Sequence, residues 1–191
     1  TAAVLAALAL TLVGCGLLSA PLLTARPVDG RPFEHVVAAT ALSVAKVGGT
    51  GCSGGGLVGS AFVAGEHLVL TAAHVVAGAR TVDLRFPGRE PVAADVVILD
   101  AGDDTAVLRV DSDLPPALAL ATTPVVAGEP VVVVGYPLAE HEVRTTYSRV
   151  TAVDESVVLG GHLLRDVLAL DAQVPIGTSG GRLESSRPAT K

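Results

Sequence analysis

The feature that most constrains the fold is a series of short apolar runs that begins near His35 and continues almost to the end of the chain. The runs are of similar length, recur roughly every ten residues and are separated by turn signals such as Pro87-Gly88. Composition agrees, because Val, Ala and Leu dominate, aromatic residues make up 3% and there is no Met or Trp. The pattern predicts an all-β fold built as an antiparallel sandwich or barrel.

Only one short stretch in this part of the chain, 72–77, has a pattern that could form a helical turn. A Pro-rich stretch at 113–128 divides the strand series into two halves, 35–113 and 125–181. The last residues, 182–191, are polar, contain Pro and show no strand pattern, so we predict a tail there. The runs predicted as strands are ALSVAKV, GSAFVAG, HLVLT, TVDLRF, PVAADVVILD, TAVLRV, PVVVVGYP, YSRVTAV and VLALDAQV.

The N-terminal region is different, because no charged residue occurs from Ala2 to Leu23. A helix of that length would span about 33 Å, which is enough to cross a bilayer core. We predict a transmembrane or signal helix over 1–24 and a linker over 25–34. Three interpretations stay open, namely a membrane anchor (which we favour), a cleaved signal sequence, and a lipoprotein signal at LVGC (Leu12–Cys15). All three would deliver the rest of the chain outside the cytoplasm.

Three residues suit nucleophilic catalysis, which needs a nucleophile, a base and an acid that orients the base. His74 follows an apolar strand in LTAAHVVAG, Asp104 opens the strand DTAVLRV, and Ser179 lies between glycines in GTSGG. Asp103 is the competitor for the acidic role. Each motif alone is weak, but the three together in the order His, Asp, Ser carry more weight.

Other classes of site fit the sequence less well. GTSGG formally matches the nucleophile elbow of α/β-hydrolases, but no His or Asp follows Ser179 and the strands do not alternate with helices. The sequence contains no zincin, phosphate-loop or EF-hand spacing, so we predict no metal and no cofactor. The formal net charge is −6 and there is no basic run, which argues against a nucleic-acid partner. The remaining histidines, predicted at the surface or in turns, are His35, His67, His141 and His162.

The motifs LTAAHVVAG, DTAVLRV, VVVVGYP and GTSGG resemble the landmarks of chymotrypsin-fold serine proteases of the bacterial trypsin-like branch, over about 35–181. The chain is most similar to the actinobacterial membrane-anchored periplasmic proteases of the acid-resistance (MarP-like) type. HtrA-type proteases share the landmarks, but they usually carry a PDZ domain. The resemblance implies two antiparallel six-stranded β-barrels, a protein or peptide substrate, and an extracytoplasmic location at the membrane.

The resemblance also implies residue roles. Ser179 would be the nucleophile, His74 the general base and acid, and Asp104 the orienting carboxylate. The backbone N–H groups of Gly177 and Ser179 would form the oxyanion hole, and Gln173 would lie at the base of the specificity pocket. A neutral amide at that place argues against a strong preference for Arg or Lys.

Two residues depart from the family pattern, because Thr178 stands where Asp or Asn is usual and Arg182 where Pro is usual. The family also continues with further strands after this motif, so we expect a C-terminally incomplete chain whose second barrel is incomplete. In that case the disulfide partner of Cys52 would be missing from the chain. The leading hypothesis is an anchored serine endopeptidase. The alternatives are a non-catalytic, protease-like binding or stress-sensing module and a structural β-sandwich.

Overall fold

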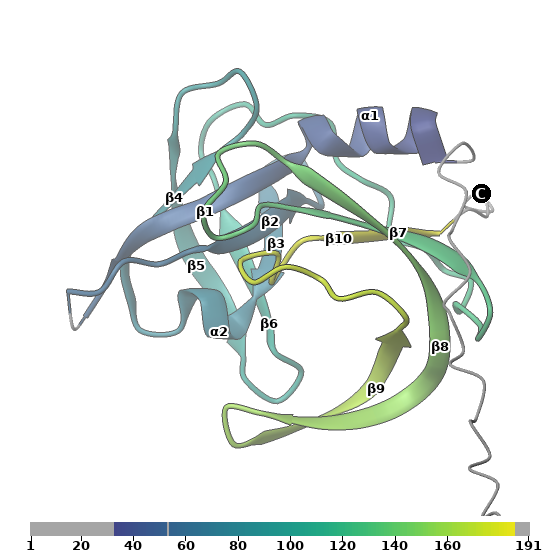
Figure 1. The fold of residues 1–191 in the computed structure, drawn as a ribbon. Coiled ribbons are helices and arrows are strands. Elements are labelled where there is room, and N and C mark those ends of the chain that lie inside the picture. Colours follow the sequence, from purple (N-terminus) through teal and green to yellow (C-terminus); the bar gives the residue numbers. More distant parts are fainter. Residues whose placement is uncertain (1–32, 53, 186–191) are drawn as a thin grey trace, which may run out of the picture.

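The computed structural model describes residues 33–52 and 54–185 (Figure 1). Two helices and ten strands lie in these residues, and all strand pairs are antiparallel. In chain order they are α1 (Glu34–Leu42), β1 (Val44–Gly51), β2 (Gly59–Val63), β3 (Leu68–Ala72), α2 (Ala73–Val76), β4 (Ala79–Arg85), β5 (Val92–Asp100), β6 (Thr105–Arg109), β7 (Pro130–Gly135), β8 (Arg144–Leu159), β9 (His162–Leu170) and β10 (Arg182–Ser185).

The first half of the fold is a closed barrel with the strand order β1-β2-β3-β6-β5-β4. Alternate residues of its strands point inward, as the alternating pattern of β4 predicts, with Val82 and Leu84 buried and Arg85 exposed. The barrel core consists largely of Val, Ala and Leu side chains, whose transfer out of water stabilises the fold. Its buried residues are Ala45, Val47, Ala61, Val63, Val69, Val75, Val76, Val82, Leu84, Phe86, Ala106, Leu108 and Val110.

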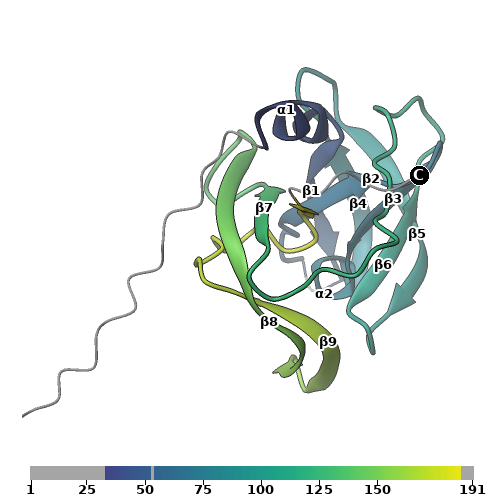
Figure 2. The ribbon, with the colours of Figure 1, turned by 90° about the vertical axis from the view of Figure 1, so that its right-hand side faces the viewer.

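The second half is a four-stranded sheet with the order β10-β7-β8-β9. β7 lies between two neighbours, and five of its six residues are buried, which explains the continuous apolar run VVVV in its sequence. β8 and β9 form a long hairpin whose tight turn uses Gly160 and Gly161, both with positive φ. The hairpin curves beneath the barrel end that carries α2 (Figures 1 and 2).

The predicted fold class is confirmed, with a closed six-stranded barrel followed by an incomplete second barrel. All nine predicted strand runs overlap a strand, and the predicted helical turn corresponds to α2. Helix α1 was not predicted, because its apolar and polar residues are not separated onto two faces. It packs over β1 and β7 at the junction of the two halves (Figure 1).

The prediction of a polar tail from Arg182 is wrong for its first four residues, which form β10 and pair with β7. Arg182 is buried, and its charge is compensated by its contacts. The guanidinium group donates hydrogen bonds to the Glu184 carboxylate at 2.8 Å and to the Ala119 carbonyl at 2.6 Å. It also lies 5.0 Å from the ring centre of Phe62. These contacts place two charged side chains on the inner face of a strand, where the sequence pattern calls for apolar ones.

At the other end, Phe33 is fully buried and Glu34 begins α1, so the fold starts within the segment predicted as a linker. The predicted transmembrane or signal helix at 1–24 lies outside the described residues. Within the described ranges, neither helix is long and apolar enough to cross a membrane.

Candidate active site

His74 and Asp104 form a two-point contact at one end of the barrel. The imidazole Nδ1 of His74 lies 2.7 Å from Oδ2 of Asp104, and the backbone N–H of His74 donates to Oδ1 of the same carboxylate at 2.9 Å. The side chain of Asp104 is 17% exposed and that of His74 is 44% exposed. The carboxylate is therefore largely screened from water, while nearly half of the His74 side chain is accessible.

The local backbone explains this contact. Ala72 is extended and ends β3, and the short helix α2 then turns His74 back toward β6. Asp104 precedes β6 in a left-handed conformation with φ of 48°, which Asp adopts more readily than most residues. The backbone N–H of Ala73 donates to the Asp104 carbonyl at 3.0 Å. Main-chain and side-chain groups of Asp104 thus both anchor the start of α2.

Ser179 lies on the loop 171–181, which connects β9 to β10, and its side chain is exposed. Two glycines of this loop require the absence of a side chain. Gly177 has φ of 97° and lies against the backbone of Leu138, and Gly180 has φ of 80° and lies against the backbone of Ser60 and Ala72. The motif GTSGG is therefore glycine-rich because the loop backbone passes very close to other backbone.

Every carbonyl from residue 176 to residue 179 accepts a hydrogen bond, and three of the four bonds come from residues outside the loop. The carbonyl of Ile176 accepts from Leu138 N–H at 2.8 Å, and that of Thr178 accepts from Gly181 N–H at 2.8 Å. The hydroxyl of Ser60 donates to the Gly177 carbonyl at 3.1 Å, and the Ser60 N–H donates to the Ser179 carbonyl at 2.8 Å. The donors are the backbone N–H groups of Leu138, Gly181 and Ser60 and the side-chain hydroxyl of Ser60.

These bonds also orient the N–H groups of the loop. In a trans peptide the N–H points opposite to the carbonyl of the preceding residue. The N–H of Gly177 therefore points away from Leu138, and the N–H of Ser179 points away from Gly181. These are the two donors that the family resemblance implies for an oxyanion hole, a role that stays a prediction.

The structure brings Ser179 to the same end of the barrel as His74 and Asp104. Gly180, which follows Ser179, contacts Ala72, which directly precedes α2. Gly180 and Asp104 also line one shared cavity of about 250 Å³. The segments that carry the three predicted residues, namely β3–α2, the start of β6 and the loop 171–181, thus come together at one end of the barrel.

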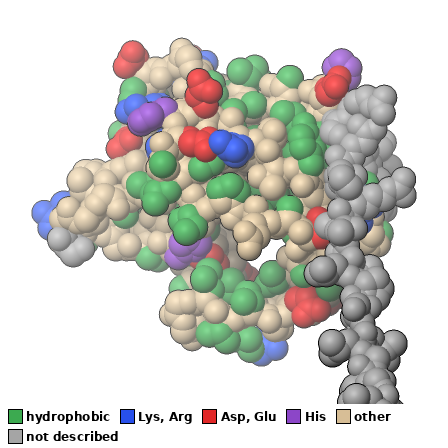
Figure 3. Space-filling view, in the orientation of Figure 1, with side chains coloured by type: hydrophobic (Ala, Val, Ile, Leu, Met, Phe, Trp, Pro, Cys, Tyr) green, Lys and Arg blue, Asp and Glu red, His purple; other side chains and the backbone are tan. Residues whose placement is uncertain are grey.

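A second cavity, of about 210 Å³, lies between the barrel and the β8–β9 hairpin. His74 and Asp104 line it on the barrel side, together with Leu99, and the tip of the hairpin contributes Leu159 and His162. The space-filling view shows the hollow between the barrel and the hairpin, with hydrophobic side chains beside it (Figure 3).

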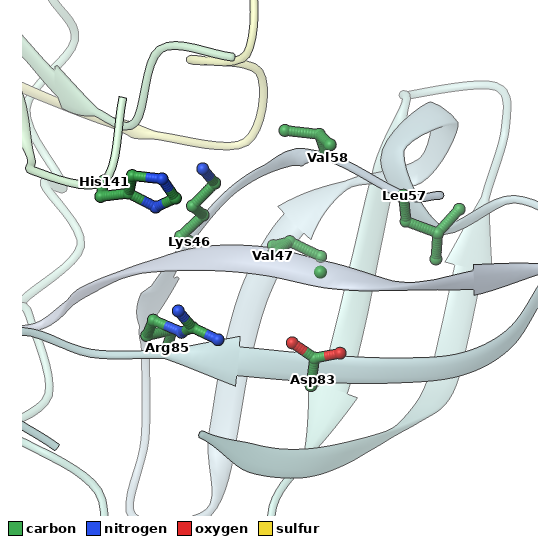
Figure 4. A pocket seen from close by; sticks show the side chains of 8 residues that line it. Lys46, Val47, Leu57, Val58, Asp83, Arg85 and His141 are labelled. Atoms are coloured by element: carbon green, nitrogen blue, oxygen red, sulfur yellow. The ribbon is translucent and has the colours of Figure 1, made fainter. Parts of the chain in front are cut away.

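A third cavity, of about 190 Å³, borders β1 and β4 on another face of the barrel (Figure 4). His141 and Lys46 lie side by side at one end, Arg85 projects below them, and Asp83 lies farther along β4. The ammonium group of Lys46 donates to the carbonyl of Glu140 at 2.8 Å. None of the predicted catalytic residues lines this cavity.

The remaining predicted residues lie apart from the His74–Asp104 pair. Gln173 is exposed on the loop 171–181, and its place at the base of a specificity pocket stays a prediction. Cys52 is exposed and free beside the β1–β2 connection, and a disulfide with a partner outside this chain also stays a prediction. In the part of the chain that the structure describes, no group of three or more His, Cys, Asp or Glu residues could hold a metal ion.

Two residues near the site were not singled out in the sequence. His162 was assigned to the surface or a turn, but it opens β9 and shares a cavity with His74. Ser60 was overlooked within GSAFV, where a polar residue interrupts an otherwise apolar strand. A small polar residue inside an apolar run that is predicted to form a buried strand is the sequence signal that could have identified it.

Comparison with known proteins gives one family and several relatives. Residues 59–185 match the trypsin-like peptidase domain. The serine protease Rv3671c of Mycobacterium tuberculosis is 37% identical over 135 residues, which cover 66% of this chain and 33% of that protein. A probable periplasmic, DegP-like serine endoprotease of Hahella chejuensis is 32% identical over 127 residues, or 65% of this chain and 26% of that protein.

Solved structures agree with these matches. The active form of the Rv3671c protease superposes with a TM-score of 0.75 and 32% identity, over 96% of this chain and 79% of that one. The HtrA-type protease AlgW with a tripeptide superposes with a TM-score of 0.72 and 27% identity, over 81% of this chain and 50% of that one. The chain spans about a third of the length of the curated relatives it matches. The predicted resemblance to chymotrypsin-fold bacterial serine proteases is confirmed.

Proposed function

The chain belongs to the trypsin-like peptidase family, and on this premise we propose that it is a serine endopeptidase that uses His74, Asp104 and Ser179. The observation that carries the proposal is the 2.7 Å contact between Nδ1 of His74 and Oδ2 of Asp104. Because Nδ1 donates its proton to the carboxylate, Nε2 is the unprotonated nitrogen of the neutral ring and can act as a base.

In the proposed reaction, the Ser179 hydroxyl attacks the carbonyl carbon of the scissile peptide bond while His74 Nε2 takes the hydroxyl proton. The imidazolium that forms is stabilised by the Asp104 carboxylate, which stays ionised. His74 then gives its proton to the amine nitrogen as the C–N bond breaks, which leaves an acyl ester on Ser179. A water molecule, deprotonated by His74, hydrolyses the ester and restores the enzyme.

The negative charge on the tetrahedral oxygen would be stabilised by the N–H groups of Gly177 and Ser179. Support comes from the carbonyls of residues 176–179, which all accept other hydrogen bonds and so fix the peptide planes to which these N–H groups belong. Loss of one such donor in an acyl-transfer enzyme costs about 3–4 kcal/mol in the transition state.

We further propose a peptide substrate and an extracytoplasmic, membrane-anchored location. The tripeptide bound to the HtrA-type relative supports the substrate class. The uncharged stretch from Ala2 to Leu23 and the periplasmic relative of Hahella chejuensis support the location. The cavity beside the exposed face of His74 offers room for substrate residues that flank the scissile bond.

A fluorophosphonate probe, which phosphonylates an activated serine, tests the proposal. The wild-type protein should be labelled, Ser179→Ala should not, and Ser112→Ala, which alters another exposed serine, should be labelled like wild type. Circular dichroism would verify that each variant is folded. A folded wild-type protein that is not labelled would contradict the enzymatic proposal and favour the non-catalytic, protease-like module instead.

A further inference from the structure

Ser60 is a fully buried polar residue in β2, a strand of the closed barrel. Its hydroxyl donates to the carbonyl of Gly177 at 3.1 Å and accepts the backbone N–H of Tyr136 at 2.8 Å. Its own N–H donates to the carbonyl of Ser179 at 2.8 Å. One residue therefore joins the barrel, the end of β7 and the loop that carries the candidate nucleophile.

The direction of the hydroxyl proton follows from these partners. A backbone N–H can only donate, so the contact with Tyr136 uses a lone pair of the hydroxyl oxygen. The proton is then available for the Gly177 carbonyl, which can only accept. Ser60 is inaccessible to solvent, so water does not compete for either bond.

The two carbonyls that Ser60 holds flank the peptide that contains the N–H of Ser179. The Gly177 carbonyl belongs to the peptide before it, and the Ser179 carbonyl to the peptide after it. Since φ and ψ are the only soft torsions between successive peptides, fixing both neighbours restricts how far the central peptide can rotate. Gly177 needs such a restraint most, because its φ of 97° lies in a region that glycine enters and leaves easily.

Ser60 is itself held in place from the barrel side. The Thr71 hydroxyl donates to the Ser60 carbonyl at 2.7 Å. On the opposite side, a Cβ placed on Gly135 would lie 3.0 Å from the Ser60 hydroxyl oxygen and 2.6 Å from Cγ2 of Thr178. The space around the hydroxyl is therefore closed, and a larger side chain at position 60 would displace the loop.

From these contacts we infer that Ser60 is a positioning residue, whose hydroxyl and N–H hold the two oxyanion donors of the loop in their catalytic orientation. This inference rests on the proposed serine-protease function and adds a residue to it. Ser60 does not touch the substrate. It acts through Gly177 and Ser179, and its loss should slow acylation without altering the His74–Asp104 pair.

The test compares Ser60→Ala with Ser43→Ala, measuring the rate of fluorophosphonate labelling as a function of pH and the free energy of unfolding. Ser43 is the matched control, because it is also buried and its hydroxyl donates to a single backbone carbonyl, that of Pro116, at 2.7 Å. Both variants should lose stability. In Ser60→Ala the maximal labelling rate should fall about 10- to 100-fold, as expected for a small displacement of catalytic groups. The midpoint of the pH profile should not move, since His74 and Asp104 remain paired.

Three results would overturn the inference. One is a maximal rate in Ser60→Ala within threefold of wild type, and another is an equal fall in Ser43→Ala. Ser60→Gly, which removes the hydroxyl and adds no volume, serves as the second variant and should show a fall of the same order. If neither variant at position 60 folds at 25 °C, the residue acts on stability and the inference fails. Absence of labelling in the wild type would instead refute the proposed function itself, so the two failures are distinguishable.

Discussion

The substitution Asp104→Asn tests the orienting role of the carboxylate with little change in shape. Asp104 has φ of 48°, a conformation that Asn adopts readily and that Ala adopts at a cost, so Asn is the better replacement here. The carboxylate accepts two bonds from the same residue, one from the backbone N–H of His74 and one at Nδ1. An amide has one oxygen and one NH₂ group, so it can accept only one of them.

The expected loss of activity in Asp104→Asn depends on which of the two hydrogen bonds to His74 the amide oxygen keeps. The backbone N–H of His74 can only donate, so the amide oxygen should remain opposite it. The NH₂ group then faces Nδ1 and can only donate, which forces the imidazole proton onto Nε2. In that tautomer His74 cannot take the proton of Ser179. We expect kcat/KM to fall about 10⁴-fold, or about 5.5 kcal/mol, as in the corresponding change in serine proteases of this mechanism.

The assay is the second-order rate constant of fluorophosphonate labelling near pH 7.5, with the unfolding free energy measured in parallel. Asp103→Asn is the matched control, because Asp103 is the exposed neighbour that competes for the acidic role in the sequence. It should react like wild type. A rate for Asp104→Asn within tenfold of wild type would refute the reasoning, and a large fall in Asp103→Asn alone would assign the role to that residue.

Other expected outcomes concern the framework around the site. Gly180→Ala should lower the unfolding free energy by several kcal/mol in urea titrations, because its Cβ would overlap a backbone carbonyl oxygen, whereas Gly128→Ala, also at positive φ but in open space, should cost only about 1 kcal/mol. Arg182→Met should destabilise the protein by about 2–4 kcal/mol, since Glu184 then lacks its partner, and adding Glu184→Gln should recover part of that loss in thermal unfolding. Burial raises the pKa of Tyr136, so the folded protein keeps this proton at a pH where the unfolded chain has released it. The unfolding free energy should therefore fall above about pH 10, by at most about 1.4 kcal/mol per pH unit, and Tyr136→Phe should remove that dependence.

The strands and the candidate catalytic residues could be predicted because both leave local signals. The alternation in β4 and the apolar run in β7 reflect which faces of these strands are buried. A strand buried in either way needs apolar residues at the same positions, so the pattern can be read from the sequence. His74 and Asp104 lie directly beside such strands, so finding the strands also located them. The order of the motifs then excluded the competing hydrolase fold.

Two elements were missed because their stability is not local. Helix α1 has no separated apolar face, and it is held by contacts with β1 and with β7, a strand that lies far from it in the sequence. β10 begins with Arg182, whose burial depends on Glu184 and on the carbonyl of Ala119, 63 residues away. A pattern based on hydrophobicity cannot anticipate a buried ion pair, because each charge is acceptable inside only when the other is present.

Ser60 shows why the geometry of the nucleophile loop could not be predicted from its own motif. GTSGG permits many backbone conformations, since its glycines leave φ almost unrestricted. The conformation is selected from outside by Leu138, by Ser60 and, through Ser60, by Thr71. A flexible motif allows the close backbone approach that an oxyanion hole needs, and rigid donors from both halves of the fold supply the orientation that the motif lacks. A change at this buried barrel serine should therefore alter catalysis more than a change of similar size at an exposed loop residue other than Ser179 and Gln173.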